Sequence, residues 1–437
     1  RAQLVYYKEE SFHFGLNNVQ ELYKFKDLFF ENHPIEQAKD KTTLLNDKKE
    51  ELASVFESVD ESQIPLNLRA QFLYLKGRCY NSVPTYDPRA LECLSKAVKL
   101  SPHLVDAWNE LGECYWKNLN IKEARVCFEG ALKQQRNRIA LRSLSILLRQ
   151  ECSNLNRTEA TEIILKSVDY AKEAVAQDPK DGMSWCVLGN AYLCQFFLVS
   201  QNRATLKLCQ SSYKQAWNDP VARSHPDLHY NKGIVLKYEE QFEEAITTFM
   251  TACRLDPPWK PPINEMKRLV YYLQYVDDLV HTKGRIKVKR IQQIVKSMDS
   301  KFYGEFAPGT ICTFGKRKVT MEHATLDKLA EGENEGKVVM GRVVGSIHSD
   351  NAVPFTFAIV DESMSCVAVN VYNWADGRGV IIGDCVVIPE PKLTTHQHSY
   401  NFRSIRINSP TLLLVNGKRI GRIQFACTKV STRYEPC

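Results

Sequence analysis

The sequence predicts a protein with two domains of different classes, an α-superhelix of repeated helix pairs followed by a small β-barrel. Two observations support this multidomain α plus β fold class. A pattern of aromatic residues, glycines and alanines recurs at fixed spacing within residues 67–299, which is typical of repeated helix pairs. From residue 300 onward, apolar and polar residues tend to alternate with a period of two, which is typical of strands. A chain of 437 residues, 44% of them hydrophobic, can bury more than one core.

The repeat is most complete between residues 108 and 131. It follows the pattern W-x2-LG-x2-Y-x8-A-x3-F-x2-A, the signature of a tetratricopeptide repeat (TPR), with Trp108, Leu111, Gly112, Tyr115, Ala124, Phe128 and Ala131. Further copies in the same register lie at residues 77–102, 185–192 and 233–257. Small residues let two helices approach closely, and large residues fill the space between them. Because one unit cannot bury its own faces, the copies predict a right-handed α-superhelix with a concave groove.

The helical region has three expected parts. Residues 1–66 carry two amphipathic helical patterns, which we expect to cap the superhelix or to form an irregular first repeat. The superhelix is expected over residues 67–299, ending in a capping helix over 263–284 and a basic helix over 285–298. The chain begins without a methionine or a signal peptide, so we interpret its start as a trimmed N-terminus.

The β-domain is expected over residues 300–437 as an OB-fold barrel. A hairpin at 310–323 precedes strand-like stretches at 336–347, 353–362, 366–374, 383–393 and 402–418. Gly341 and Gly345 predict a bulge in the first of these stretches, which an OB-fold uses to turn its corner. The next two stretches carry Phe355, Phe357, Tyr372 and Trp374. We interpret these aromatic residues as core, with a stacking platform for single-stranded nucleic acid as the alternative.

The sequence contains no motif that indicates an enzyme. It has no phosphate-binding loop, G-x-S-x-G elbow or H-E-x-x-H pair, so we predict no catalytic residue and no cofactor. The 14 cysteines include no C-x-x-C pair, which favours buried free thiols. His396 and His398 lack a third ligand at short spacing, which favours a surface loop over a metal site. No apolar run approaches the roughly 18–20 residues that span a bilayer, and no membrane partner is expected.

Two charged residues are candidates for peptide binding. TPR grooves bind short extended peptides or chain ends through side chains on the first helix of each unit. Arg149 lies at the end of the helical stretch 141–150, and Asp227 lies in the segment HPDLHY, at or near such a helix. The alternative is that both residues are solvated, or that Asp227 caps its own helix beside Pro226.

A basic strip occupies residues 283–290 (KGRIKVKR). It has five basic residues and no acidic one: Lys283, Arg285, Lys287, Lys289 and Arg290. The formal net charge of the whole chain is only +7, so this strip accounts for most of the surplus. Such a strip suits the phosphates of a nucleic acid. A solvated capping helix or a nuclear-import signal is the alternative.

Several segments together resemble one family. They are CLSKAVKLSPHLVDAWNELGECYWK, HPDLH with KYEEQFEEA, AVPFTFAIVD, and GVIIGDCVVIPEP with LLLVNGK. These segments resemble the tetratricopeptide repeat protein 5 (Strap) family, and the resemblance covers nearly the whole chain. It implies a TPR superhelix with a C-terminal OB-fold.

The resemblance implies two roles, one cytoplasmic and one nuclear. In the cytoplasm, the TPR groove would recognise the N-terminal Met-Arg-Glu-Ile or Met-Arg-Glu-Cys of nascent α- and β-tubulin. The protein would contact ribosomal RNA and proteins near the exit tunnel and, through an mRNA-decay adaptor, trigger decay of tubulin mRNA (tubulin autoregulation). In the nucleus, the protein would be a stress-responsive transcription cofactor. It would scaffold a histone acetyltransferase coactivator, and its OB-fold would contact DNA or chromatin.

The resemblance also implies roles for individual residues. The groove arginine of the family falls on Arg149, and one of its acidic residues falls on Asp227. A second acidic position falls on Pro261, which departs from the family; Asp256 or Glu265 is the expected replacement. The ribosome-contacting lysine of the family falls on Lys287, inside the basic strip.

Overall fold

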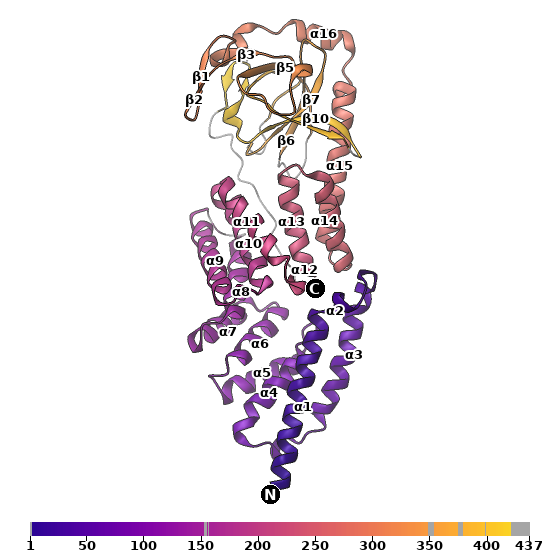
Figure 1. Cartoon of the computed structure of the whole chain (residues 1–437), viewed down its shortest axis with the longest axis vertical. Helices are drawn as coiled ribbons and strands as arrows, with labels where there is room; N and C mark the ends of the chain where they lie inside the picture. The colour runs from indigo at the N-terminus through magenta and orange to yellow at the C-terminus, as the bar shows by residue number, and fades with distance from the viewer. Residues whose placement is uncertain are drawn as a thin grey trace. The chain divides into compact units, whose positions relative to one another are not determined.

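The computed structural model describes residues 2–152, 155, 157–347, 354–374, 379–397 and 399–420. It confirms the predicted fold class, a helical repeat region followed by a β-domain (Figure 1). The chain divides into two compact units, of which the first ends at Met266 and the second begins at Lys267.

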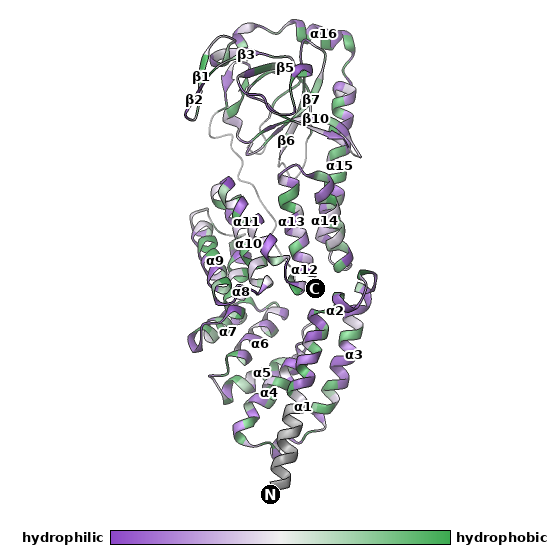
Figure 2. Ribbon diagram, viewed as in Figure 1, coloured by the Kyte–Doolittle hydropathy of each residue, from purple (hydrophilic) through white to green (hydrophobic). Residues whose placement is uncertain are grey.

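The first unit is helical, and most of its helices are paired. The N-terminal arm contains α1 (Ala2–Asp27), α2 (Phe29–Asn32), η1 (Ile35–Gln37), α3 (Ala38–Glu57) and η2 (Glu61–Gln63). The pairs are α4 (Leu66–Tyr80) with α5 (Pro88–Leu100), α6 (Val105–Lys117) with α7 (Ile121–Gln134), α8 (Arg138–Glu151) with α9 (Arg157–Gln177), α10 (Gly182–Gln195) with α11 (Arg203–Ala216), and α13 (Pro226–Tyr238) with α14 (Phe242–Leu255). The π-helix η4 (Phe196–Ser200) extends α10, α12 (Pro220–Arg223) precedes α13, and α15 (Lys260–Thr282) begins in this unit. Hydrophobic and hydrophilic residues alternate along these helices, as expected of amphipathic elements (Figure 2).

Glycine at the small position of the repeat lets the two helices of a pair touch. In the pair α6 and α7, a Cβ on Gly112 would lie 2.8 Å from the ring of Phe128. In the pair α13 and α14, a Cβ on Gly233 would lie 2.6 Å from the ring of Phe249. Both rings are almost completely buried, so the glycine is required by close approach of the helices.

We expect Gly112→Ala to destabilise the first unit, although alanine is the better helix former by about 1 kcal/mol. The new methyl group would overlap a buried ring, and such overpacking costs about 1–3 kcal/mol. Urea unfolding followed by circular dichroism measures the change. Gly130→Ala is the matched control, because its Cβ would lie 3.1 Å from a half-buried indole, that of Trp108. Equal stability of wild type and Gly112→Ala would contradict the packing argument.

The spacing of six residues from proline to tryptophan also has a physical cause. The indole of Trp108 donates a hydrogen bond to the carbonyl oxygen of Pro102 at 2.8 Å, and Trp185 donates to Pro179 at the same distance. In two repeats the aromatic residue therefore fixes the turn that leads into its own helix.

The N-terminal arm contacts both ends of the repeat stack. At one end, α1 and α3 share an apolar cluster with α4, which includes Val19, Leu22, Leu45, Leu52, Phe56 and Phe72. At the other end, Glu31 pairs with Arg223 of α12 at 3.0 Å, and Glu36 pairs with Arg254 of α14 at 2.5 Å. We predicted a cap or an irregular first repeat; the arm packs on the first pair and also reaches the last.

Within the described residues, the second unit contains the rest of α15, five short helices and the β-strands. After α15 come η5 (Lys283–Arg285), α16 (Val288–Lys296) and η6 (Ser300–Phe306). The strands are β1 (Ile311–Phe314), β2 (Arg317–Thr320), β3 (Glu322–His323), β4 (Gly332–Glu333), β5 (Lys337–Ile347), β6 (Phe355–Val360), β7 (Cys366–Val371), β8 (Cys385–Pro389), β9 (Lys392–Gln397), β10 (Asn401–Ile407), β11 (Leu414–Val415) and β12 (Lys418–Arg419), with η7 (Leu326–Lys328) and η8 (Pro410–Leu412) between strands.

The strands form a hairpin and one mixed sheet. The hairpin pairs β1 with β2, as predicted for residues 310–323. The sheet has the order β12-β11-β8-β5-β6-β7-β10-β9-β4, and β3 pairs with β5. Within the described strands the hydrogen-bonded sheet is not closed, although β8 and β9 are separated only by Glu390 and Pro391. The predicted bulge is present, because the register of β5 against β6 shifts between Val343 and Gly345.

The four candidate aromatic residues of the β-domain are core residues. Phe355, Phe357, Tyr372 and Trp374 are each at most 8% exposed. Their burial confirms the core interpretation and leaves these rings unavailable for stacking on bases.

The C-terminal half of α15 packs on the β-domain. The Tyr272 hydroxyl lies 3.0 Å from Thr356 Oγ1 and 3.0 Å from Asn370 Oδ1, two buried polar groups of β6 and β7. The second unit therefore includes this part of α15, whereas the sequence pattern predicts a β-domain over residues 300–437.

Cysteines and histidines have ordinary structural surroundings. The described residues contain 12 free cysteines, and burial raises the pKa of Cys186 well above its usual value. The prediction of a surface loop is wrong for His396, which is half-buried in strand β9 and lies 2.9 Å from Ser404 Oγ; His398 lies outside the described residues. No group of three or more metal-ligating side chains occurs in the described ranges.

One described helical stretch, Gly182–Ser200, is long and apolar enough to cross a membrane by length and composition. It is α10 with η4, and 72% of the apolar window is buried within the protein. A core helix of the repeat stack has these properties.

Candidate peptide-binding site

Arg149 and Asp227 are both buried on first helices of their repeats. Arg149, on α8, is 9% exposed, and Asp227, in the first turn of α13, is 8% exposed. His225 is the N-cap of α13, and the carboxylate of Asp227 bonds to other side chains. These positions exclude both alternatives considered for Asp227, a solvated residue and a cap of its own helix.

The guanidinium of Arg149 is held by neutral groups. Its Nη1 donates to Ser145 Oγ at 2.9 Å, to Ser167 Oγ at 3.3 Å and to the carbonyl of Val187 at 3.4 Å. These contacts come from α8, α9 and α10, so three helices fix the position of the charge. A buried guanidinium that is held by neutral oxygens keeps its positive charge unpaired. It is therefore well suited to bind an anionic group of a ligand.

The carboxylate of Asp227 is held by two amides. Asn190 Nδ2, on α10, donates to Oδ2 at 2.6 Å, and Asn231 Nδ2, one turn further along α13, donates to Oδ1 at 3.0 Å. Tyr213 of α11 in turn donates to Asn190 Oδ1 at 2.7 Å, and Asn231 Nδ2 also lies 3.0 Å from that oxygen. The network orients the carboxylate without neutralising it.

The two charges influence one another. Burial raises the pKa of Asp227, and the hydrogen bond from Asn190 and the charge of Arg149 oppose this rise. The charges of both residues also act on the pKa of Cys186, on the intervening helix α10. Both predicted residues therefore contact α10, Arg149 through the carbonyl of Val187 and Asp227 through the amide of Asn190, and neither forms an ion pair with the other among the described contacts.

The acidic position lost at Pro261 has two nearby carboxylates. Pro261 lies in the first turn of α15 and is half-buried. Glu265, one turn later, is already paired with Lys237 at 3.2 Å. Asp256, the C-cap of α14, is half-buried; burial raises its pKa, and the charge of Lys41 on the arm opposes this rise. Asp256 is therefore the better candidate for a replacement carboxylate.

The basic strip lies on η5, the two residues that follow it and the first turn of α16, and it is not uniformly exposed. Lys283 Nζ donates to the carbonyl of Met364 at 2.8 Å, and Arg285 pairs with Asp278 at 3.0 Å. Arg285, Lys287, Lys289 and Arg290 are exposed, and Lys283 is half-buried. Because Lys283 and Arg285 are engaged within the protein, the other three residues are the part of the strip that is best placed for an external partner.

The exposed basic residues lie at the N-terminus of α16, where positive charge destabilises a helix. Lys287 is its N-cap, Lys289 and Arg290 lie in its first turn, and that turn has no acidic residue. Cations at a helix N-terminus oppose the helix dipole. The helix is anchored instead by buried Ile291 and by Arg342, which donates to the carbonyls of Ile294 and Ser297 at 3.1 and 2.6 Å. Local stability therefore does not explain the basic residues.

The residues that support Asp227 are not predicted by the repeat pattern. Asn190, Tyr213 and Asn231 come from three helices, and only Asn231 has a visible signal, because it lies four residues after Asp227 on the same face.

A stack of helix pairs with charged residues on first helices, joined to an OB-type β-domain, defines a TPR adaptor. Models of the tetratricopeptide repeat match residues 105–138 and 226–258, and a model described as "Tetratricopeptide repeat protein 5 OB fold domain" matches residues 320–429. The chain is 40% identical over 421 residues to "Tetratricopeptide repeat protein 5" of Homo sapiens, Bos taurus and Mus musculus, covering 95% of this chain and 95% of each relative. The chain belongs to the tetratricopeptide repeat protein 5 family, a family of repeat adaptors that are generally non-catalytic.

Proposed function

We propose that this adaptor reads the N-terminal Met-Arg-Glu-Ile or Met-Arg-Glu-Cys of nascent tubulin at the ribosome. In this proposal the inner helices bind the peptide, the basic strip contacts ribosomal RNA near the exit tunnel, and a recruited mRNA-decay adaptor destroys the tubulin message. The protein acts in the cytoplasm in this role. The proposal is supported by the family membership and by the chemistry of Arg149 and Asp227.

The observation that carries the proposal is the pair of buried, opposite charges held by neutral groups. A peptide arginine can donate two hydrogen bonds to Asp227, and the adjacent peptide glutamate can accept from Arg149. Burial of a charge costs free energy unless the charge is paired. A ligand group of opposite charge therefore offsets part of the desolvation cost of Asp227 and of Arg149. The nuclear cofactor role gains less support, because the four aromatic residues that would stack on DNA are buried.

Ribosomes that carry stalled nascent chains test the proposal. Chains beginning Met-Arg-Glu-Ile should retain the purified protein during sedimentation, and chains beginning Met-Ala-Ala-Ile should not. Equal retention on both, or on neither, would contradict reading of the tubulin N-terminus. Loss of tubulin mRNA decay in cells that carry Asp227→Ala would connect binding with decay.

Binding of the peptide should weaken as the pH falls, because burial raises the pKa of Asp227. The native state holds this proton more tightly than the unfolded chain does. Protonation therefore adds stability as pH decreases through the raised pKa, while it removes the charge that binds a guanidinium. Of the titratable groups around the carboxylate, Cys186 and Tyr213 stay neutral because burial raises their pKa values.

Fluorescence anisotropy between about pH 7 and pH 5 measures this dependence. A peptide with glutamine in place of glutamate serves as the ligand. A glutamate has a pKa of about 4.3, and its own protonation would add to the pH dependence. Asp227→Ala should bind weakly at every pH. A wild-type affinity that does not change with pH would contradict the role of an ionised Asp227.

A further inference from the structure

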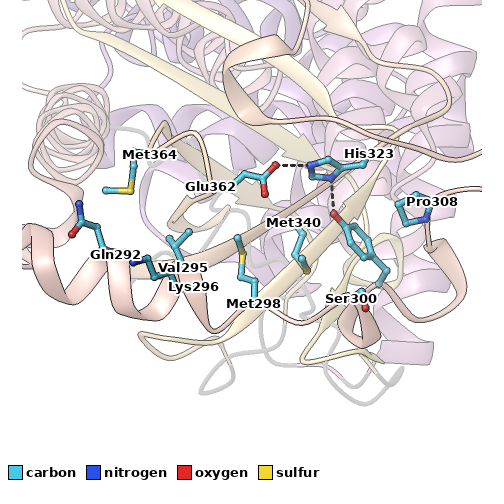
Figure 3. A pocket seen from close by; sticks show the side chains of 11 residues that line it. Gln292, Val295, Lys296, Met298, Ser300, Pro308, His323, Met340, Glu362 and Met364 are labelled. Carbon is cyan, nitrogen blue, oxygen red and sulfur yellow. Dashed lines mark hydrogen bonds and ion pairs between the residues drawn. The ribbon is translucent and has the colours of Figure 1, made fainter.

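The second unit contains a cavity that the proposed function does not use. It has a volume of about 700 Å³ and lies among α16, η6, β3, β5 and the turn after β6. Its wall includes three thioethers and a set of three connected polar side chains, namely Met298, Met340 and Met364 with Tyr303, His323 and Glu362 (Figure 3). Gln292, Lys296 and Ser300 are further polar residues of the wall. We call it the methionine pocket. Its volume lies in the range of ligand-binding cavities, about 300–1,000 Å³.

The polar side chains form one hydrogen-bonded chain. Tyr303 Oη lies 2.5 Å from His323 Nδ1, and His323 Nε2 lies 3.0 Å from Glu362 Oε1, as the dashed lines in Figure 3 show. With a neutral imidazole, the network assigns Tyr303 as the donor to Nδ1 and His323 as the donor to Glu362. The chain then presents oxygen acceptors to the cavity, and Oε2 of Glu362 is placed to accept from a ligand.

The outer pair of this chain, His323 with Glu362, contributes little to stability of the fold, whereas Tyr303 is a core residue. The side chains of His323 and Glu362 are 36% and 61% exposed, and pairs this exposed contribute little to stability. The neighbouring Asp361 is buried and binds the backbone nitrogens of Leu326 and Ser363, so it folds the turn without help from Glu362. Glu362 is therefore available for a ligand.

Met364 has a backbone conformation that is unfavourable for methionine. Its φ is 60°, in the left-handed region, where glycine or asparagine would be less strained. Its amide donates to the carbonyl of Asp361 at 3.0 Å, and its own carbonyl accepts from Lys283 at 2.8 Å. The strained turn holds a flexible, polarisable thioether at the cavity wall.

We propose that the methionine pocket is a docking site for a short peptide segment in which an apolar side chain is flanked by lysine or arginine. The apolar side chain packs among the thioethers, which adapt to varied shapes. The basic side chain donates to Glu362, and Lys296 at the wall can donate to a peptide carbonyl. The wall thus carries one carboxylate and one ammonium group, and a peptide can satisfy both, with a basic side chain at Glu362 and a backbone carbonyl at Lys296. This site is independent of the inner-helix residues and does not rest on the proposed function.

Methionine methyl resonances of the full chain test the proposal directly. The chain has 7 methionines, of which three line the pocket, so ¹³C-methyl labelling gives few signals that single Met→Leu variants assign. The probe is the N-acetylated peptide Gly-Phe-Lys-Leu-Lys-Gly amide. We expect the signals of Met298, Met340 and Met364 to shift together and to saturate with a Kd below about 1 mM. Met321, fully buried in the same unit and outside the cavity wall, should not shift.

Two variants separate binding from folding. Glu362→Gln keeps the shape and removes the charge, so it should weaken binding about tenfold. Met364→Gly removes a thioether and relieves the left-handed strain, so it should weaken binding without lowering Tm. Glu335→Gln, which changes an exposed carboxylate paired with Arg317, is the matched control and should bind like wild type.

Three results would overturn the proposal. The first is no methyl shift with the probe peptide at a concentration of about 1 mM. The second is equal binding of the acidic peptide Gly-Phe-Glu-Leu-Glu-Gly, which would remove the role of Glu362. The third is a shift with adenosine monophosphate and none with the basic peptide, which would indicate a nucleotide site instead.

Discussion

Replacing either Asp227 or Arg149 by alanine is expected to reduce binding of a Met-Arg-Glu-Ile peptide at least about thirtyfold. Truncating one partner of a buried, hydrogen-bonded charge pair costs about 2–5 kcal/mol, because the other charge is left unpaired in the complex. Fluorescence anisotropy with a labelled peptide measures the loss. A peptide extended at its N-terminus should bind weakly even to the wild-type protein, since the proposed reader recognises a free chain end.

The controls for this prediction lie on α8 and α9, the helix pair that carries Arg149. Arg138, on α8, and Asp169, on α9, have the same charges and are largely exposed, so alanine at either position should leave the affinity unchanged. Thermal unfolding must show that Asp227→Ala is folded, because the substitution removes the carboxylate that accepts from the amides of Asn190 and Asn231. If folded Asp227→Ala or Arg149→Ala binds the peptide with wild-type affinity, that residue does not take part in peptide binding.

Reversing the charges of Lys287 and Lys289 together should abolish detectable association with ribosomes at physiological salt. Both residues are exposed at the start of α16, and contacts with phosphates dominate binding to RNA. In a weakened but measurable variant with both lysines changed to glutamine, the slope of log K against log salt should fall by about 1.5, or about 0.7–0.9 for each lost contact. Sedimentation with purified ribosomes at several salt concentrations gives both quantities.

Unfolding of α16 does not account for such a loss. Glutamates at the start of a helix interact favourably with its dipole, so the reversed variant should be at least as stable as the wild type. Lys316 and Lys318, exposed on the β1–β2 hairpin, are the matched control pair, and their reversal should leave ribosome association intact. Equal losses from both reversals would mean that only the net charge matters.

The helix pairs were predictable because their constraints are local in the sequence. Gly112 and Phe128 lie in one repeat, and the bond from Trp108 to Pro102 spans six residues. The bulge of β5 was predictable for the same reason, since Gly345 marks it within one strand. Periodicity and small residues at fixed spacing carry this information.

The candidate site was predictable only in part. Repeat position, together with the family resemblance, identified Arg149 and Asp227. The hydrogen bonds that hold Asp227 in place were not predictable, because they join residues on different helices. Asn190 is 37 residues from Asp227 in the sequence, and Tyr213 is 23 residues from Asn190. No periodicity encodes such a network. The methionine pocket was invisible for the same reason, because Tyr303, His323 and Glu362 come from three separate segments. The reach of the arm to α12 and α14 depends on ion pairs between residues about 190 or more positions apart.

The most direct test of the central claim is a double-mutant cycle between protein and peptide. Asp227→Ala is combined with alanine at the peptide arginine, Arg149→Ala is combined with alanine at the peptide glutamate, and the two crossed combinations serve as controls. The account predicts coupling energies of about 1.5 kcal/mol or more for the first two combinations and values near zero for the crossed ones. Additive losses in all four combinations would show that these residues do not bind the peptide charges, and would contradict the account.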